Sequence, residues 1–209
     1  MANVLTPVAR PRGRTRQLTL EISERIIAKE GVDALKLKDI ADEIGIQVPS
    51  LYKHFQSRDD ILISISAAYI AALAVLFAID DTRSTEENLI VGIQELVELF
   101  ARHPAWMRLQ LRDYSSVEGT EALSRYTGGI KNLGTEGQLG GFVMRLETLL
   151  KDGVRSGDFR PVQPLDFSNI LFGTLCFQVA GFGGKILTKT QTQGLQTLMV
   201  DTLLRYVKA

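Results

Sequence analysis

Side chains that could donate hydrogen bonds to phosphate oxygens are concentrated in one short segment, QVPSLYKHF, residues 47–55. The donors in this segment are Ser50, Tyr52, Lys53 and His54. Leu51 and Phe55 lie four positions apart and therefore share one face of a helix, with Val48 one turn earlier. We expect a helix over about residues 48–55 that docks through this apolar face and displays a polar, basic and aromatic surface.

A helix of seven or eight residues is unstable alone, because nucleation fixes several dihedral angles before enough hydrogen bonds accumulate. Neighbouring elements must therefore hold it. Apolar residues recur at helical spacing over residues 37–44, and Gly45 favours the left-handed conformation that ends a helix. An earlier helix is expected over residues 14–30, ending at Gly31. Pro49 fits the first turn of the short helix, where its missing N–H would have had no partner.

The formal net charge is zero, but the charge is unevenly distributed. Residues 1–20 contain Arg10, Arg12, Arg14 and Arg16 and no acidic residue, whereas residues 21–60 contain more acidic than basic side chains. Phosphate contacts from the short helix would therefore be few and individually positioned, and the arginine arm would supply the general attraction. A solvated terminal tail is the alternative interpretation of that arm.

The chain as a whole predicts an all-α protein, because apolar residues recur at intervals of three and four and no long stretch alternates as a strand would. Ser57, followed by two aspartates, is a plausible N-cap, and Ser84 to Glu87 looks like a capping box. The helices expected after the short one cover about residues 57–79, 84–102, 104–112, 138–156, 166–187 and 190–208. The glycine-rich residues 115–141 are expected to form a mobile connection.

Residues 61–79 contain no charged side chain and are long enough to span a bilayer. A membrane-anchored helical protein is therefore an alternative reading of the chain. Against it, aspartates bracket the segment at both ends, and no Lys/Arg cluster, second span or aromatic belt accompanies it. A helix buried on most sides by other helices has the same composition, and we prefer this interpretation.

Composition limits the possible functions. A chain of 209 residues with 45% hydrophobic residues can bury a large core. Its single cysteine, Cys176, excludes a disulfide framework and fits a reducing interior, and the first residues lack the order of a signal peptide, so a cytoplasmic location is expected. Two distant histidines and no Gly-rich phosphate loop give no catalytic constellation, so neither an enzyme nor a cofactor or metal site is expected.

Two segments resemble a known family. Residues 31–62, GVDALKLKDIADEIGIQVPSLYKHFQSRDDIL, look like the N-terminal helix-turn-helix domain of the TetR family of transcriptional regulators. The matching positions are Gly31, Ile40-Ala41, Gly45-Ile46, Leu51-Tyr52, His54-Phe55 and Arg58. Residues 149–175, LLKDGVRSGDFRPVQPLDFSNILFGTL, resemble a C-terminal pattern of the family. In this pattern a helix ends at Gly and is followed by a basic residue, then Pro, and then a dimerisation helix. The likeness covers the whole architecture, but only about residues 15–62 are specific in sequence.

In that family the short helix enters the major groove of DNA. The resemblance therefore implies DNA contacts for Lys38, Val48, Pro49, Ser50, Tyr52, Lys53, His54 and Arg58. Arg58 stands where the family usually has a phosphate-binding lysine, and either Lys38 or Lys53 could also reach guanine. Val48 or Pro49 could touch a thymine methyl group. These residues indicate how the helix would be positioned on DNA, but they do not indicate which base sequence it would bind.

Two positions depart from the family pattern. Lys36 stands where a Thr or Ser commonly caps the second helix, and Gln47 replaces the usual small cap of the recognition helix. Each helix should be less firmly capped, by about 1 kcal/mol if nothing compensates. The charge of Lys36 near a helix N-terminus is unfavourable unless a phosphate lies nearby, which favours DNA as the partner.

The resemblance also implies a role for the rest of the chain. It divides the protein into a flexible basic arm (1–13), a helix-turn-helix domain (14–57) and an effector-binding and dimerisation domain (58–209), with the last two helices forming the homodimer. The effector cavity could be lined by Trp106, Met107, Tyr114, Tyr126, Phe142 and Phe177, with Arg102, Gln110 and Gln178 adding polarity. The expected function is a repressor that a small, mostly apolar effector releases from a near-palindromic operator.

Overall fold

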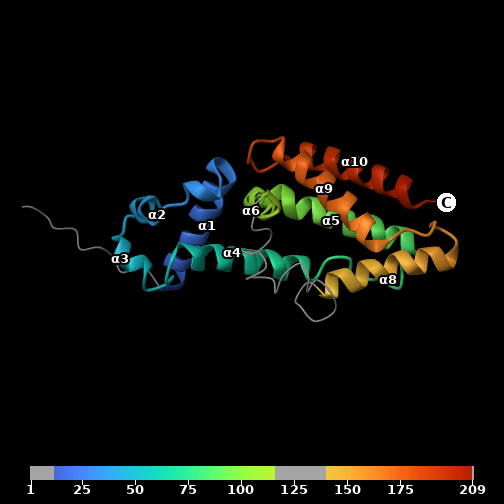
Figure 1. The fold of residues 1–209 in the computed structure, drawn as a ribbon, viewed down its shortest axis with the longest axis horizontal. Coiled ribbons are helices and arrows are strands. Elements are labelled where there is room, and N and C mark those ends of the chain that lie inside the picture. Colours follow the sequence, from blue (N-terminus) through green and yellow to red (C-terminus); the bar gives the residue numbers. More distant parts are fainter. Residues whose placement is uncertain (1–11, 116–139, 209) are drawn as a thin grey trace, which may run out of the picture.

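The computed structural model describes residues 12–115 and 140–208, which are helical almost throughout (Figure 1). The described helices are α1 Arg12–Glu30, α2 Leu37–Ile44, α3 Val48–Leu51, α4 Arg58–Leu73, α5 Thr85–Arg102, α6 Pro104–Ser115, α8 Gly140–Ser156, α9 Pro164–Ala180 and α10 Lys189–Val207, with a 3-10 turn, η1, at Val32–Ala34. The expected all-α fold is confirmed, and α2 has the expected bounds. The connection expected over residues 115–141 lies almost wholly outside the described residues.

The N-terminal unit consists of α1, η1, α2 and α3, closed by the start of α4. Helix α1 contacts η1, α2 and α4, and α2 contacts α3. The apolar faces of these elements meet in one core that includes Ile27, Leu35, Ile40, Leu51 and Phe55. Helix α3 is therefore held by Leu51 and Phe55, as their spacing predicts.

The larger C-terminal unit is a layered helical bundle. Helices α9 and α10 lie side by side along one edge of the molecule, and α5 packs against α10, α9 and α8 (Figure 1). Helix α6 connects the two units because it contacts α1 as well as α4, α5 and α9. The capping box that begins α5 is confirmed, since Glu87 N–H donates to Ser84 Oγ and Ser84 N–H to the Glu87 carboxylate.

The long apolar helix expected up to Ile79 ends at Leu73 instead. Arg145 of α8 donates hydrogen bonds to the carbonyls of Leu76, at 2.8 Å, and Ala74, and these bonds hold the chain in a turn. Phe77 adopts a positive φ of 54° there, and its ring is buried. Leu76 and Phe77 are therefore buried in a turn, whereas Val75 and Ile79 of the same apolar stretch are exposed. In the part of the chain that the structure describes, no helix is long and apolar enough to cross a membrane.

Helix α9 differs from expectation in a similar way. It begins at Pro164 and ends at Ala180, not at Leu187. Gly183 and Gly184 follow with positive φ values of 65° and 78°, so the backbone turns toward α10. A Cβ atom on Gly184 would overlap the carbonyl oxygen of Ala28 in α1, so this turn contacts the N-terminal unit at a distance that only glycine permits.

The packing of Phe77 gives a stability prediction. A Cβ added at Gly92 of α5 would overlap the Phe77 ring, so Gly92→Ala should lower the free energy of unfolding by about 1–3 kcal/mol, despite the better helix propensity of alanine. Gly194→Ala in α10 is the matched control, because its Cβ would meet no other group within 4 Å. It should be neutral or stabilising by up to about 1 kcal/mol in the same urea titration. Equal effects of the two substitutions would contradict the close approach at Gly92.

Candidate nucleic-acid interface and ligand-binding core

The turn between α2 and α3 orients the candidate interface. Gly45 has φ 76° and ψ 42°, the left-handed conformation expected at the end of α2. The N–H groups of Gly45 and Ile46 both donate to the carbonyl of Ala41, each at 2.9 Å. Gly45 N–H also lies 3.1 Å from the Asp42 carbonyl, so two carbonyls near the end of α2 are paired and the chain reverses direction before α3.

Helix α3 is shorter than expected. Its helical residues end at Leu51, and the N–H groups of His54 and Phe55 both donate to the Leu51 carbonyl, at 2.8 and 3.0 Å. The chain thus tightens into a turn that carries Phe55 back into the core. No side chain caps α3 at Gln47, nor α2 at Lys36, as the two departures from the usual caps predict. A single uncapped turn depends on its packing for its position.

The surface that α3 and the following turn display matches the expected pattern. Tyr52 is 54% exposed. Lys38, Pro49 and Lys53 are also exposed, and Val48, Ser50 and His54 are half-buried. Each of these seven residues therefore keeps part of its surface exposed, whereas Leu51 and Phe55 are buried.

The eighth residue, Arg58, is directed toward the protein. Its Nε donates to the carbonyl of Leu35 at 3.0 Å, a terminal nitrogen donates to the carbonyl of Val32, and the same group lies 3.9 Å from the Asp33 carboxylate. Arg58 thereby holds η1 against the start of α4. Its expected phosphate contact stays a prediction, and it would use the remaining N–H donors.

Two arginines of α1 contact α2, α4 and the turn that follows α3. Arg16 donates to Ser64 Oγ of α4 at 3.2 Å, and its guanidinium lies 5.1 Å from the centroid of the Phe55 ring. Arg25 pairs with Glu43 of α2. Because both contacts originate on α1, the displayed surface should follow the position of that helix.

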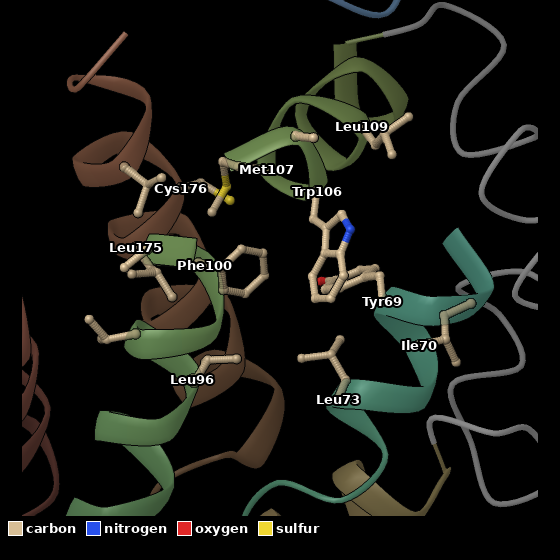
Figure 2. Packing of buried hydrophobic residues seen from close by; sticks show 14 of the residues in the cluster. Tyr69, Ile70, Leu73, Leu96, Phe100, Trp106, Met107, Leu109, Leu175 and Cys176 are labelled. Carbon is tan, nitrogen blue, oxygen red and sulfur yellow. The ribbon is translucent and has the colours of Figure 1, made fainter. Parts of the chain in front are cut away.

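A buried aromatic cluster forms the centre of the C-terminal unit (Figure 2). Tyr69 of α4 lies 5.6 Å from Phe100 of α5 and 5.4 Å from Trp106 of α6, measured between ring centroids. Phe172 of α9 continues the cluster at 6.4 Å from Phe100 and 5.7 Å from Phe142 of α8. Five helices therefore meet around one mostly apolar group.

The structure brings together only part of the residues expected to line a cavity. Trp106, Met107 and Phe142 are buried in the core. Phe177 is 78% exposed, and Gln178 and Arg102 are also exposed, the latter paired with Glu98. Tyr126 lies outside the described residues. Gln110 and Tyr114 belong to α6, but their side chains are not among those described. Tyr69 was missed, although an aromatic residue with a polar tip in an otherwise aliphatic run was an available signal.

The two units are joined where α6 meets α1. His103 Nδ1 lies 3.1 Å from the carboxylate of Glu24, and Arg108 Nε donates to the Ala28 carbonyl at 2.7 Å. The His103 ring also stacks on Trp106, with centroids 4.0 Å apart and planes 8° from parallel. A continuous series of contacts thus runs from the aromatic cluster to α1. Sequence pattern did not predict it, because its members are far apart in the chain.

Comparison with known proteins agrees with this geometry. Residues 20–65 match the model of the bacterial regulatory proteins, tetR family. The chain is 30% identical over 199 residues to the HTH-type transcriptional repressor KstR2 of Rhodococcus jostii (strain RHA1), covering 91% of each protein.

Two solved structures share the fold. The ketosteroid transcriptional regulator KstR2 of Mycobacterium tuberculosis has a TM-score of 0.66 at 19% identity, with 98% of this chain and 100% of that one covered. The regulator FadR of Bacillus subtilis, in complex with stearoyl-CoA, has a TM-score of 0.63 at 17% identity, with 90% and 97% covered. Together with the helix-turn-helix geometry and the full-length relative, the family match shows that the chain belongs to the TetR family of bacterial regulatory proteins.

Proposed function

We propose that the protein is a cytoplasmic, homodimeric repressor that binds a near-palindromic operator and is released by a small, mostly apolar effector. The observation that carries the proposal is the displayed surface of α3 and its following turn, fixed on the buried Leu51 and Phe55. The domain division at residues 14–57 and 58–209, with the basic arm before it, belongs to the same proposal.

The exposed residues have distinct roles in this proposal. Val48, Pro49 and Ser50 approach the bases of the major groove, whereas Tyr52, Lys53 and His54 donate to backbone phosphates. Lys38 of α2 reaches a base or a phosphate from the neighbouring helix. A phosphate close to Lys36 would also offset its unfavourable charge at the N-terminus of α2.

Helices α9 and α10 support a dimer. Large apolar side chains are exposed on these helices and their connecting turn, namely Leu165, Phe177, Ile186 and Leu198. A two-fold axis would bury them against the same surface of a second copy and present two α3 helices to successive major grooves. This arrangement requires an operator with two related half-sites.

The effector class is inferred from the aromatic cluster and from two relatives. Tyr69, Phe100, Trp106 and Phe142 give the C-terminal unit a mostly apolar centre. The FadR structure of Bacillus subtilis contains stearoyl-CoA, and the mycobacterial KstR2 is described as a ketosteroid regulator. Both chemistries combine an extended apolar skeleton with oxygen atoms, and we propose a ligand of that class here.

Coupling between the effector and DNA would use two connections. Helix α4 links the cluster through Tyr69 to η1 through Arg58. Helix α6 links it to α1 through the contacts of His103 and Arg108. A shift of α6 or α4 would then reorient α3 as a rigid body. A coupling free energy of about 1–3 kcal/mol would weaken DNA binding roughly 5- to 150-fold.

The dimer and its operator can be tested together. In footprinting of DNA from its own promoter region, the protein should protect two related half-sites in successive major grooves. Phe177→Asp should shift the protein toward monomer in sedimentation and lower operator affinity roughly 100-fold, because bivalent binding is lost. Val75→Asp is the control, since Val75 is similarly exposed but lies after α4. A single asymmetric half-site bound by a monomer would refute this arrangement.

Lys53→Ala tests the phosphate contacts. It should weaken binding to all DNA sequences and reduce the slope of log affinity against log salt by about 2 for the dimer, because each chain loses one phosphate contact. Thermal stability should not change, since Lys53 is exposed. Lys151→Ala, on α8 at the opposite end of the molecule (Figure 1), should leave the slope unaltered. An unchanged slope with altered base preference would reassign Lys53 to base recognition.

His103→Phe tests the connection between α6 and α1. Phenylalanine keeps a ring beside Trp106 but cannot bond Glu24, so ligand affinity should persist while ligand weakens DNA binding less than in the wild type. Glu24→Leu should have the same effect, and the double variant should add nothing, because both changes break one contact. Fluorescence anisotropy with labelled operator, with and without ligand, measures the coupling. Additive effects would place the coupling elsewhere.

A further inference from the structure

We infer that the indole N–H of Trp106 is the polar anchor of the effector site and binds a neutral carbonyl oxygen of an otherwise apolar ligand. The inference rests on the proposed function, because it specifies the chemistry of the same site. A ligand bound in this way contacts Trp106 directly, so a signal from Trp106 reports ligand binding.

The anchor is an unpaired donor. Trp106 is only 4% exposed, and its Nε1 has no hydrogen-bond partner. Among the side chains that the structure describes, no other buried nitrogen or oxygen lacks one. A buried N–H that has lost its water and gained no acceptor is costly, so native structures pair such groups almost without exception. The donor therefore calls for an acceptor that the described residues do not supply.

The surroundings define the acceptor's chemistry. In Figure 2 the indole nitrogen lies on the edge away from Phe100, on the side of Leu109 and α4, and aromatic rings and alkyl groups form the neighbourhood. Arg108 is directed toward α1 by its bond to the Ala28 carbonyl, and His103 contacts Glu24. An anionic group in this apolar setting would need a counter-charge that the neutral indole cannot supply, whereas a neutral carbonyl needs only the one donor.

A trapped water molecule is the competing explanation. A buried water typically makes about three hydrogen bonds to polar groups. Apart from the Tyr69 hydroxyl, the buried neighbours of Trp106 named above are apolar, so they offer it few partners. A ligand carbonyl accepts the single N–H and places its apolar remainder against Tyr69, Leu73 and Leu109, so it satisfies both features of the site.

The chain contains one tryptophan, so this site has its own spectroscopic signal. In full-length protein labelled with ¹⁵N-tryptophan, the indole N–H gives a single NMR peak. The probes are 2-tridecanone against tridecane, and 5α-androstan-3-one against 5α-androstane. At least one ketone should move the indole proton downfield and bind about tenfold more tightly than its hydrocarbon, which is the contribution of roughly one hydrogen bond.

Trp106→Phe should bring the affinity ratio of ketone to hydrocarbon close to one, because it keeps an aromatic ring and removes the donor. Phe167→Leu is the control, since it alters a buried aromatic residue of α9 but removes no donor, and it should keep the preference. The peak shift in the wild-type protein does not depend on either variant folding.

Three results would overturn the anchor: an indole peak that neither ketone moves, equal affinities within both pairs, or a persistent cross-peak to bound water that the probes leave in place. A compound that releases operator without moving the indole peak would also overturn it, while leaving the proposed regulator intact. Failure to bind any DNA would refute the proposed function, and the ketone titration would still decide the anchor.

Discussion

The contact between α1 and α6 is the constraint on which the rest of the molecule depends. Glu24 and Ala28 are bound by His103 and Arg108, and these bonds place the N-terminal unit on the C-terminal one. Helix α1 in turn contacts α2 through Arg25 and the turn after α3 through Arg16, so the displayed surface should follow the position of α1. A helix with one uncapped turn has little stability of its own, and α3 therefore takes its orientation from α1.

The free energy expected for the contact between α1 and α6 is in the range that regulation requires. A typical hydrogen bond contributes about 0.5–1.5 kcal/mol net, so losing one or two of them matches the 1–3 kcal/mol of common allosteric coupling. The two units could then shift relative to each other without unfolding either core. Helix α4 supplies a second connection, but it ends at Leu73 and is shorter than the uncharged sequence suggests. The buried turn at Phe77, braced by Arg145, separates α4 from α5.

Local signals predicted the elements well, because caps and glycine turns act over a few residues. The left-handed Gly45 and the Ser84 capping box were both readable from sequence. Residues 74–79 and 181–187 were predicted as helix because they are apolar, yet contacts with distant residues hold them as turns: Arg145 binds two carbonyls of the first, and Gly184 of the second lies against Ala28. The exposed side of α3 could be predicted from the spacing of its apolar residues. The residues of the aromatic cluster could not, because α9 is apolar on several faces and its sequence does not show that Phe177 is exposed. Contacts such as His103 with Glu24 exist only in the folded chain.

The most direct test of this account is the distance between the two N-terminal units of a dimer. Burial raises the pKa of Cys176 to about 11, so this thiol stays protonated and unreactive at neutral pH, and a spin label can be placed selectively at Asp42→Cys on the exposed side of α2. Pulsed electron paramagnetic resonance then measures the separation of the labels. The account predicts that a ligand bound at Trp106 changes this separation and that His103→Phe greatly reduces the change. A ligand that releases operator while the distance distribution stays the same would contradict it.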